Sequence, residues 1–326
     1  MQYRSYADLA HVIAMRGHLL PPDIDLVVGV PRSGLLAANM ICLARNLPLV
    51  DLDGFVEGRV FGTGWTKRSA GAAKNASGRR HILVVDDSIS SGRSMREARD
   101  KLAAARTNAR ITFCAVFGRP DADNPEADII LERVPLPRVF EWNLFHHDEL
   151  GKMCLDIDGV LCHDPDHNQN DDGDRYLGFL REAQPLYATT RPIGHLVTSR
   201  LEKYRAHTEQ WLNRHGIEYN KLWMLDLPTA ADRRRLGAHA TFKASIYKKS
   251  KATLFVESEA LQARQIASLS GKPVLSIAEH RIVYGLDDPR TALPAPPPRP
   301  SLVQFAYHRL RRTAKLALGM PKTQQR

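Results

Sequence analysis

The sequence lacks several features that would place the chain in a membrane or outside the cell. No apolar run reaches 18 residues, the length that a membrane-spanning helix needs, and residues 1–12 contain no hydrophobic segment of a signal peptide. Only four cysteines occur, at positions 42, 114, 154 and 162, and their spacing matches no metal site. These absences predict a cytoplasmic protein, or one on the inner face of a membrane, with reduced and mostly buried thiols.

The length and composition are those of a folded protein with about two domains. The chain has 326 residues, of which 43% are hydrophobic, and this is enough to build the cores of two domains of ordinary size. From the motifs described below we expect domains at residues 1–150 and 151–290, followed by a tail at 291–326. The expected fold class is α/β, with two doubly wound, mostly parallel sheets and a basic C-terminal helix.

The first motif that carries chemistry is HILVVDDSISSGRSM, residues 81–95. Its apolar run predicts a buried parallel strand, and the residues that follow favour a helix, so the serine-rich loop lies at a helix N-terminus, where anions bind. Asp86 and Asp87 would repel a phosphate, so we expect them to face sugar hydroxyls, or a magnesium ion that holds them. The loop therefore predicts a sugar phosphate as ligand. The alternative is a capped turn with two solvated aspartates.

The segment VVDDSISSGRSM closely resembles the motif with which type I phosphoribosyltransferases bind 5-phosphoribosyl-1-diphosphate. The resemblance implies that Asp86 and Asp87 are catalytic residues facing the ribose hydroxyls, and that the next residues hold the 5-phosphate. VPRSG, which follows a second predicted strand, is similar to the pyrophosphate loop of the family, where a strained peptide occurs. The implied binding residues are Val30, Pro31, Arg32, Ser33, Gly34, Ser88, Ile89, Ser90, Ser91, Gly92, Arg93 and Ser94.

Two further segments of the first domain carry weaker signals. Residues 57–80 are rich in Gly, Ala, Lys and Arg and show no clear period, so we expect them to be mobile in the free protein. The resemblance favours a lid that closes over the diphosphate, and the alternative is an inert basic loop. The unranked candidate cations are Lys67, Arg68, Lys74, Arg79 and Arg80. Residues 139–147 resemble the aromatic end of some purine-type members, where Trp142 either contributes to the site or simply packs.

A second motif, GKMCLDIDGVLCHDP at residues 151–165, places two aspartates one residue apart at the end of a predicted strand. Because side chains alternate along a strand, Asp156 and Asp158 point the same way, so that one can attack while its neighbour handles protons. Two close carboxylates also need a cation, and magnesium suits oxygen ligands and can bridge to a phosphate. The spacing therefore predicts a magnesium site.

LDIDGVL resembles motif I of the haloacid dehalogenase superfamily in its phosphatase form. The resemblance implies that Asp156 is the nucleophile, which becomes a phosphoaspartate, and that Asp158 is the general acid and base. Matching motifs follow in the expected order. Thr198, in HLVTSR, is implied to bind phosphate oxygens, and Glu257, at the end of TLFVES, to hold magnesium together with Asp156 and Asp158.

Two positions of this resemblance stay open. The usual acidic residues of the fourth motif are aspartates, and Glu257 acts alone, with Ser258 or with Glu259. The lysine of the third motif is assigned to Lys243, with Lys248 as the alternative. The gaps between motifs, about 36 and about 42 residues, leave no room for a large cap domain, which suits a bulky or polymer-linked substrate. Residues 163–174, rich in His and Asp, are expected to form a hydrated loop or small cap rather than an independent metal site.

The last 34 residues change character. LPAPPPRP, residues 293–300, is a stiff polyproline spacer, and a segment with helical period follows it. Residues 299–326 contain seven Lys or Arg and no acid, and thus supply most of the net charge of +10. We expect this tail to bind an acidic partner, to lie on anionic lipid, or to pack on its own second domain. Nucleic acid is not expected, because no aromatic platform or binding motif accompanies the charge.

The pair of resemblances predicts one function. A fused phosphatase would hydrolyse the nucleotide that a transferase makes. The combination is useful if the phosphate is needed only for the transfer step and is then removed. We therefore expect transfer of 5-phosphoribofuranose from phosphoribosyl diphosphate to a glycan acceptor, followed by removal of the phosphate, with Mg²⁺ in both domains. This is similar to two-step ribofuranosylation in bacterial polysaccharide and O antigen assembly, and the tail suits a lipid-linked acceptor at the inner membrane. The alternatives are a soluble enzyme that makes a nucleoside or secondary metabolite from a base, and a non-catalytic sensor.

Overall fold

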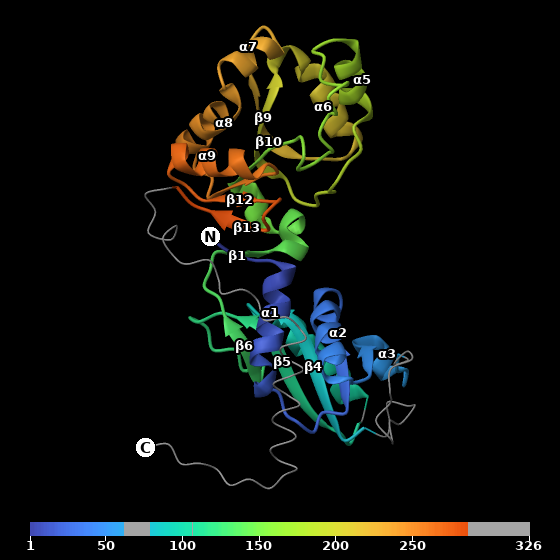
Figure 1. Ribbon diagram of the computed structural model, residues 1–326. Coiled ribbons are helices and arrows are strands. Elements are labelled where there is room, and N and C mark those ends of the chain that lie inside the picture. Colours follow the sequence, from blue (N-terminus) through green and yellow to red (C-terminus); the bar gives the residue numbers. More distant parts are fainter. Residues whose placement is uncertain (62–78, 106, 286–326) are drawn as a thin grey trace, which may run out of the picture. The chain divides into compact units, whose positions relative to one another are not determined.

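Apolar runs form the central strands of an N-terminal parallel sheet (Figure 1). The computed structural model describes residues 1–61, 79–105 and 107–285. The strands of this sheet are β2 (Leu26–Gly29), β3 (Leu49–Asp51), β4 (His81–Ser88), β5 (Arg110–Gly118) and β6 (Ile129–Arg133). They lie in the order β3-β2-β4-β5-β6, so the winding reverses between β2 and β4. In open sheets of this kind, ligands bind at the carboxyl ends of the strands beside that reversal.

Helices cover both faces of this sheet, as a doubly wound fold requires. One apolar core joins the sheet to α1 (Tyr6–Arg16) and α2 (Ser33–Arg45), and the other joins it to α3 (Leu52–Val56) and α4 (Arg93–Ala104). A short pair of parallel strands, β1 (Gln2–Arg4) and β7 (Arg138–Phe140), lies outside the sheet. Among the described residues of this half are also the short 3₁₀ helices η1 (Gly17–Leu19), η3 (Glu141–His146) and η4 (Asp148–Lys152).

A second sheet of six strands follows in the chain. Its strands are β8 (Met153–Leu155), β9 (Ile193–Leu201), β10 (Tyr219–Leu225), β11 (Leu254–Glu257), β12 (Val274–Ser276) and β13 (Arg281–Val283). The order is β10-β9-β8-β11-β12-β13, and every neighbouring pair is parallel except β12 with β13. The winding therefore reverses between β8 and β11, which places a second candidate ligand position at their carboxyl ends.

Helices also cover both faces of the second sheet. One core includes side chains of α5 (Asp174–Glu182) and α6 (Arg205–Arg214), and the other includes side chains of α8 (Ala238–Lys249) and α9 (Ala260–Ser270). Two short elements, η5 (Glu202–Tyr204) and α7 (Ala230–Arg235), lie in the connections. None of the helices described above combines the length and the apolar surface that a membrane crossing needs.

The α/β class with two mostly parallel sheets is confirmed. The first sheet ends at Arg133 and the second begins at Met153, so the expected boundary near residue 150 falls between them and stays a prediction. The four cysteines are buried and form no disulfide, as expected. The basic tail at 291–326 and the candidate lid cations Lys67, Arg68 and Lys74 lie outside the described residues.

Candidate active sites

The first candidate site lies where β2 and β4 end, on either side of the reversal. The segment 30–34 begins as the loop after β2 and continues into the first turn of α2, which starts at Ser33, and the peptide bond between Pro31 and Arg32 is cis. A β-carbon on Gly34 would lie 2.7 Å from the carbonyl oxygen of Val85. Glycine at this position therefore allows the loop after β2 to contact the end of β4.

The acidic pair of the first site is buried and linked to both loops. Ser33 Oγ donates to Asp87 Oδ1 at 2.6 Å, and Trp142 Nε1 donates to Asp87 Oδ2 at 2.8 Å. Both carboxylate oxygens of Asp87 thus accept hydrogen bonds from the protein, so that Asp87 joins the two loops to Trp142. The indole ring also stacks on Phe140, with ring centroids 5.0 Å apart, so Trp142 both packs and contacts the acidic pair.

Asp86, the other member of the acidic pair, is buried beside Asp87. Its Oδ1 accepts a hydrogen bond from the backbone N–H of Asp87 at 2.9 Å. Burial, together with the charge of Asp87, raises the pKa of Asp86 to about 8. No lysine or arginine of the described chain forms an ion pair with either aspartate, so a cation or ligand hydroxyls would be needed to ionise Asp86 at neutral pH. The carboxylate oxygens of Asp86 are therefore suited to coordinate magnesium or to accept hydrogen bonds from a sugar diol.

The predicted phosphate loop joins β4 to α4. Some of its residues fix the backbone, and others are exposed where an anion could bind. Ile89 is an anchor, since its N–H donates to the Phe117 carbonyl oxygen and its own carbonyl accepts from Arg138, both at 2.8 Å. Gly92 caps α4 with φ at 77°, a left-handed conformation that favours glycine. The hydroxyl-bearing side chains at 90, 91 and 94 are exposed at the helix N-terminus, where they can reach an anion. Arg93 instead pairs with Glu97 at 2.9 Å on the outside of α4.

Two predicted lid cations do not lie at this site. Arg79 is buried and donates from Nη1 to the carbonyl oxygen of Asp25, and the backbone N–H of Arg80 donates to the carboxylate of Asp25. Both residues precede β4, and the five strand residues 81–85 place Asp86 about 20 Å further along the strand. Arg79 and Arg80 therefore fix the start of the strand, and their assignment to the diphosphate is corrected.

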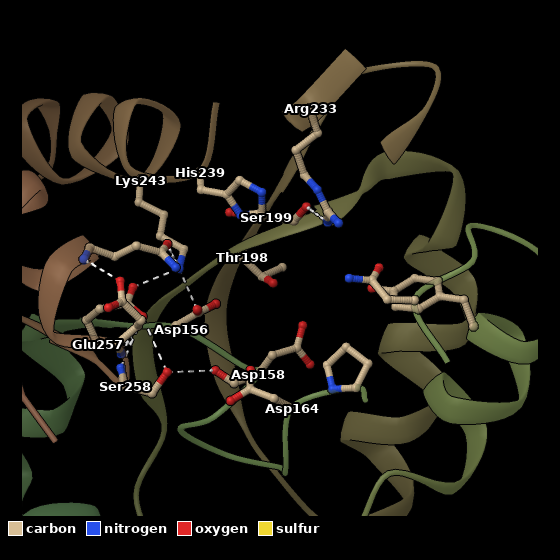
Figure 2. Close-up of a pocket in the computed structure, with 15 residues that line it drawn as sticks. Asp156, Asp158, Asp164, Thr198, Ser199, Arg233, His239, Lys243, Glu257 and Ser258 are labelled. Atoms are coloured by element: carbon tan, nitrogen blue, oxygen red, sulfur yellow. Dashed lines mark hydrogen bonds and ion pairs between the residues drawn. The ribbon is translucent and has the colours of Figure 1, made fainter. Parts of the chain in front are cut away.

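The second candidate site forms at the reversal between β8 and β11 (Figure 2). Lys243, from α8, donates to Asp156 Oδ2 at 2.5 Å and to Glu257 Oε2 at 2.7 Å. Thr198, at 0% exposure on β9, lines the same cavity of about 280 Å³. The structure thus brings together four residues that the sequence singled out. Lys248, the alternative lysine, is exposed at the end of α8.

This trio of one ammonium and two carboxylates is almost fully buried. Burial raises the pKa of Asp156, and it raises the pKa of Glu257 to about 7, while Lys243 opposes both shifts. For Lys243, burial lowers the pKa, but the two carboxylates outweigh this effect and leave it raised. Lys243 therefore stays charged, and its charge is the cation that holds Asp156 and Glu257 together.

Asp158 has a different partner, which the sequence interpretation missed. Arg200 Nη2 donates to Asp158 Oδ1 at 2.6 Å, and Arg200 Nε lies 3.1 Å from both carboxylate oxygens. The Arg200 side chain is completely buried. Arg200 follows Thr198 by two residues on β9, so both side chains leave the same face of the sheet. A signal was present, since an arginine on a buried strand needs an anion or other hydrogen-bond acceptors to offset its burial.

The three carboxylates predicted to hold magnesium do not converge on one point. Asp158 turns to Arg200, and Asp156 shares Lys243 with Glu257. Across residues 1–61, 79–105 and 107–285, no group of three or more His, Cys, Asp or Glu side chains is arranged to hold a metal ion. The residues as placed therefore do not fit the predicted three-carboxylate site, because an ammonium occupies the position between two of its members.

Neighbouring acidic residues have structural partners. Glu259 caps α9, because its carboxylate accepts from the N–H groups of Leu261 and Gln262, at 2.9 and 2.6 Å. Ser258 Oγ lies 3.4 Å from a Glu257 carboxylate oxygen, so of the two candidates only Ser258 adjoins that carboxylate directly through its side chain. In the loop 163–174, Asp172 accepts from the backbone N–H of Ala230 at 2.9 Å, which ties the loop to α7.

Comparison with known proteins identifies the first half of the chain. The family model described as phosphoribosyl transferase domain matches residues 4–149. The N-terminal half therefore contains a phosphoribosyltransferase domain of type I. Over 118 residues the chain is 29% identical to an orotate phosphoribosyltransferase of Nocardioides sp., and this alignment covers 36% of the chain and 62% of the relative.

Solved structures of low sequence identity also resemble this chain. A xanthine-guanine-hypoxanthine phosphoribosyltransferase of Helicobacter pylori is 17% identical, with a TM-score of 0.32, and the match covers 44% of this chain and 92% of that one. A purine phosphoribosyltransferase of Pyrococcus horikoshii is 18% identical, with a TM-score of 0.29 and coverages of 43% and 92%.

Proposed function

We propose that the chain is a bifunctional enzyme that transfers 5-phosphoribofuranose from phosphoribosyl diphosphate to a glycan acceptor and then removes the 5-phosphate. The first activity is supported by the phosphoribosyltransferase domain and by the two loops that meet at Gly34. In the first step, an acceptor hydroxyl attacks C1 of the ribose, and the C1–O bond to diphosphate breaks. The N-terminus of α4 would hold the 5-phosphate, and Arg32 and Ser33 would face the diphosphate. Magnesium, when bound beside Asp86, would neutralise charge on the leaving group.

The second activity rests on the buried trio beside Thr198, and this is the single observation that carries the two-step proposal. We infer that Asp156 attacks the phosphorus, that the bond to the ribose oxygen breaks, and that water then cleaves the phosphoaspartate. Lys243 and Thr198 would hold the phosphate oxygens, and Asp158, oriented by Arg200, would transfer the protons. The resemblance of LDIDGVL to haloacid dehalogenase phosphatases supports these roles.

The proposal extends to the place where the enzyme works. The cavity of the second candidate site lies in a domain without room for a large cap, which suits an acceptor too large to be enclosed. The basic sequence of residues 299–326 supports peripheral contact with the anionic inner face of the inner membrane, where lipid-linked glycans are assembled. We therefore propose a lipid-linked acceptor.

The test is to supply phosphoribosyl diphosphate and lipid-linked glycan to Asp156→Asn and to follow products by mass spectrometry. We expect the variant to accumulate a product heavier than that of the wild type by one phosphate, which an unrelated phosphatase converts to the wild-type product. Asp226→Asn is the matched control, because Asp226 is an exposed aspartate after β10. A variant product already lacking phosphate would overturn the two-step order.

One observation favours the alternative function. The curated relative is named as an orotate phosphoribosyltransferase, so its acceptor is a free base. The corresponding proposal for this chain is a soluble enzyme that makes a nucleotide from a base and hydrolyses it to a nucleoside. Incubation with phosphoribosyl diphosphate and a panel of bases, orotate included, separates the two. If nucleotides form rapidly and no ribose is transferred to glycans, the ribofuranosylation proposal is wrong and the soluble enzyme is favoured.

A further inference from the structure

A buried arginine without a carboxylate partner lines the cavity of the second candidate site. Arg233, on α7, is 7% exposed, and its Nη1 donates to the carbonyl oxygen of Ser199 at 2.9 Å. In the part of the chain that the structure describes, the guanidinium forms no ion pair, and its buried Nε has no hydrogen-bond partner. A buried cation is costly unless an anion pairs with it, so this arrangement indicates a place for a negatively charged ligand group.

Ser199 gives an independent indication at the same place. Its buried Oγ also lacks a hydrogen-bond partner among the described residues, and it lines the same cavity. Buried polar atoms in folded proteins are normally paired, and two unpaired donors on touching residues mark a position for a ligand with acceptor oxygens. Nearby His239 provides no compensating negative charge, and burial, with the charge of Arg233, lowers its pKa to about 4.

The position of Arg233 separates it from the proposed phosphate ligands. In Figure 2, Lys243, Glu257 and Ser258 lie on one side of the cavity, Arg233 and Ser199 lie on the other, and Thr198 lies between them. The cavity of about 280 Å³ is close to the smallest size of ordinary ligand pockets, enough for a phosphate and the sugar next to it. An anion on Arg233 would therefore belong to the part of the substrate next to that sugar.

We propose that Arg233 and Ser199 bind a second anionic group of the substrate, a carboxylate or a phosphate, distinct from the phosphate that is removed. This inference rests on the proposed phosphatase function and narrows it, because the acceptor joined to the ribose would then be acidic. The guanidinium would form a paired, charge-assisted contact with two oxygens, and the Ser199 hydroxyl would donate to one of them.

The experiment uses two matched pairs of phosphoribosyl compounds and the full-length chain. Orotidine and uridine 5′-monophosphate differ by one carboxylate, and ribose 1,5-bisphosphate and ribose 5-phosphate differ by one phosphate. Calorimetric titration measures the dissociation constant of each compound for the wild type and for Arg233→Gln. Both proteins keep the first site, so a difference between their affinities reports binding in the cavity that Arg233 lines. We expect the wild type to bind, in one pair, the member with two anionic groups about tenfold or more tightly than its partner, and Arg233→Gln to lose most of that ratio. Which pair shows the effect distinguishes carboxylate from phosphate.

Arg234→Gln is the control, because Arg234 is the exposed neighbour on the same short helix and carries the same charge. It should keep the wild-type ratio for both pairs. Equal ratios in wild type and Arg233→Gln, or equal losses in both variants, would overturn the proposal. Phosphate release from the same compounds is measured in parallel. If no chain releases phosphate, the phosphatase proposal fails, while the binding ratios still judge the role of Arg233.

Discussion

A single lysine holds the second site together. Lys243 is 2% exposed and lies between Asp156 and Glu257, which have no other cationic partner among the ion pairs of the described chain. We expect Lys243→Met to lower the free energy of unfolding by about 3–5 kcal/mol, because it leaves two buried carboxylates unpaired. Urea denaturation at pH 8 measures this change.

The control for this prediction is Lys248→Met, five residues further along α8. Lys248 is exposed, and its replacement should change the free energy of unfolding by no more than about 0.5 kcal/mol. Phosphate release should be lost in Lys243→Met and unchanged in Lys248→Met. An equal loss in both variants would contradict the assignment of Lys243 and return Lys248 to consideration.

Asp86 should make stability depend on pH in a direction opposite to that of an ordinary salt-bridged aspartate. Its pKa is raised to about 8 in the folded chain, against about 3.9 for an unfolded aspartate. Between these values the folded chain binds a proton that the unfolded chain has lost. The contribution of Asp86 is therefore complete below about pH 4 and is lost as the pH rises through about 8.

Urea denaturation of wild type and Asp86→Asn from pH 5 to pH 8 tests this linkage. The asparagine variant cannot lose the proton, so its stability relative to the wild type should increase steadily across this range. Other groups with raised pKa values, such as Glu257, are present in both chains and cancel in the difference. A difference that does not change with pH would show that Asp86 is ionised in the folded chain.

At the scale of elements, the contact between the α2 N-terminus and β4 depends on one missing side chain. A β-carbon on Gly34 would lie 2.7 Å from the Val85 carbonyl oxygen and 3.0 Å from Asp86 Cα, so backbone would have to move. We expect Gly34→Ala to cost about 1–3 kcal/mol of stability and to weaken the binding of phosphoribosyl diphosphate. Thermal unfolding and calorimetric titration measure the two effects.

Gly17→Ala is the comparison variant in the same half of the chain. Gly17 has nothing within 4 Å of an added β-carbon and a right-handed helical backbone, so alanine should be neutral or slightly stabilising. If Gly34→Ala proved equally harmless, the two loops would not depend on this close approach.

The sequence predicted most of the strands that carry the sites, because their signal is local. The apolar run before Asp86 lies in β4, and the strand predicted to end at Asp156 is β8; both strands end at a reversal of winding. The order of the strands was not readable, since it depends on pairings between segments far apart in the chain. The choice between the lysines depended on helix geometry, because Lys243 shares its buried face with Ala244 and Tyr247.

The side-chain partners were harder to predict than the elements. Arg200 takes both oxygens of Asp158, and it comes from 42 residues further along the chain. Arg233 comes from a short helix with the sequence AADRRR, in which the other two arginines are exposed and nothing in the spacing singles out Arg233. Asp87, predicted to face the ribose, also accepts hydrogen bonds from Ser33 and Trp142, two partners that the sequence interpretation did not name. Such pairings depend on burial, which sequence spacing does not reveal.

At the scale of the whole molecule, each sheet has its own cores and its own site, and the basic tail adds a third part to the sequence. Removal of residues 301–326 should reduce sedimentation with vesicles containing anionic lipid, because it deletes six of the seven Lys and Arg found between Arg299 and Arg326. The remaining binding should also depend less on salt. Hydrolysis of a small phosphate should be unchanged. Equal vesicle binding by both chains would refute membrane contact through the tail and favour the soluble alternative.

The burial of the four cysteines has a practical consequence for covalent chemistry. Burial raises the pKa of Cys42, Cys114 and Cys154 to about 12, so almost no reactive thiolate is present at pH 7. The native chain should therefore take up almost no maleimide until it is unfolded in denaturant. A cysteine introduced at an exposed position, such as Leu43→Cys, would then be the dominant labelling point. The Leu43→Cys variant should thus carry a single fluorophore without prior removal of the four native thiols.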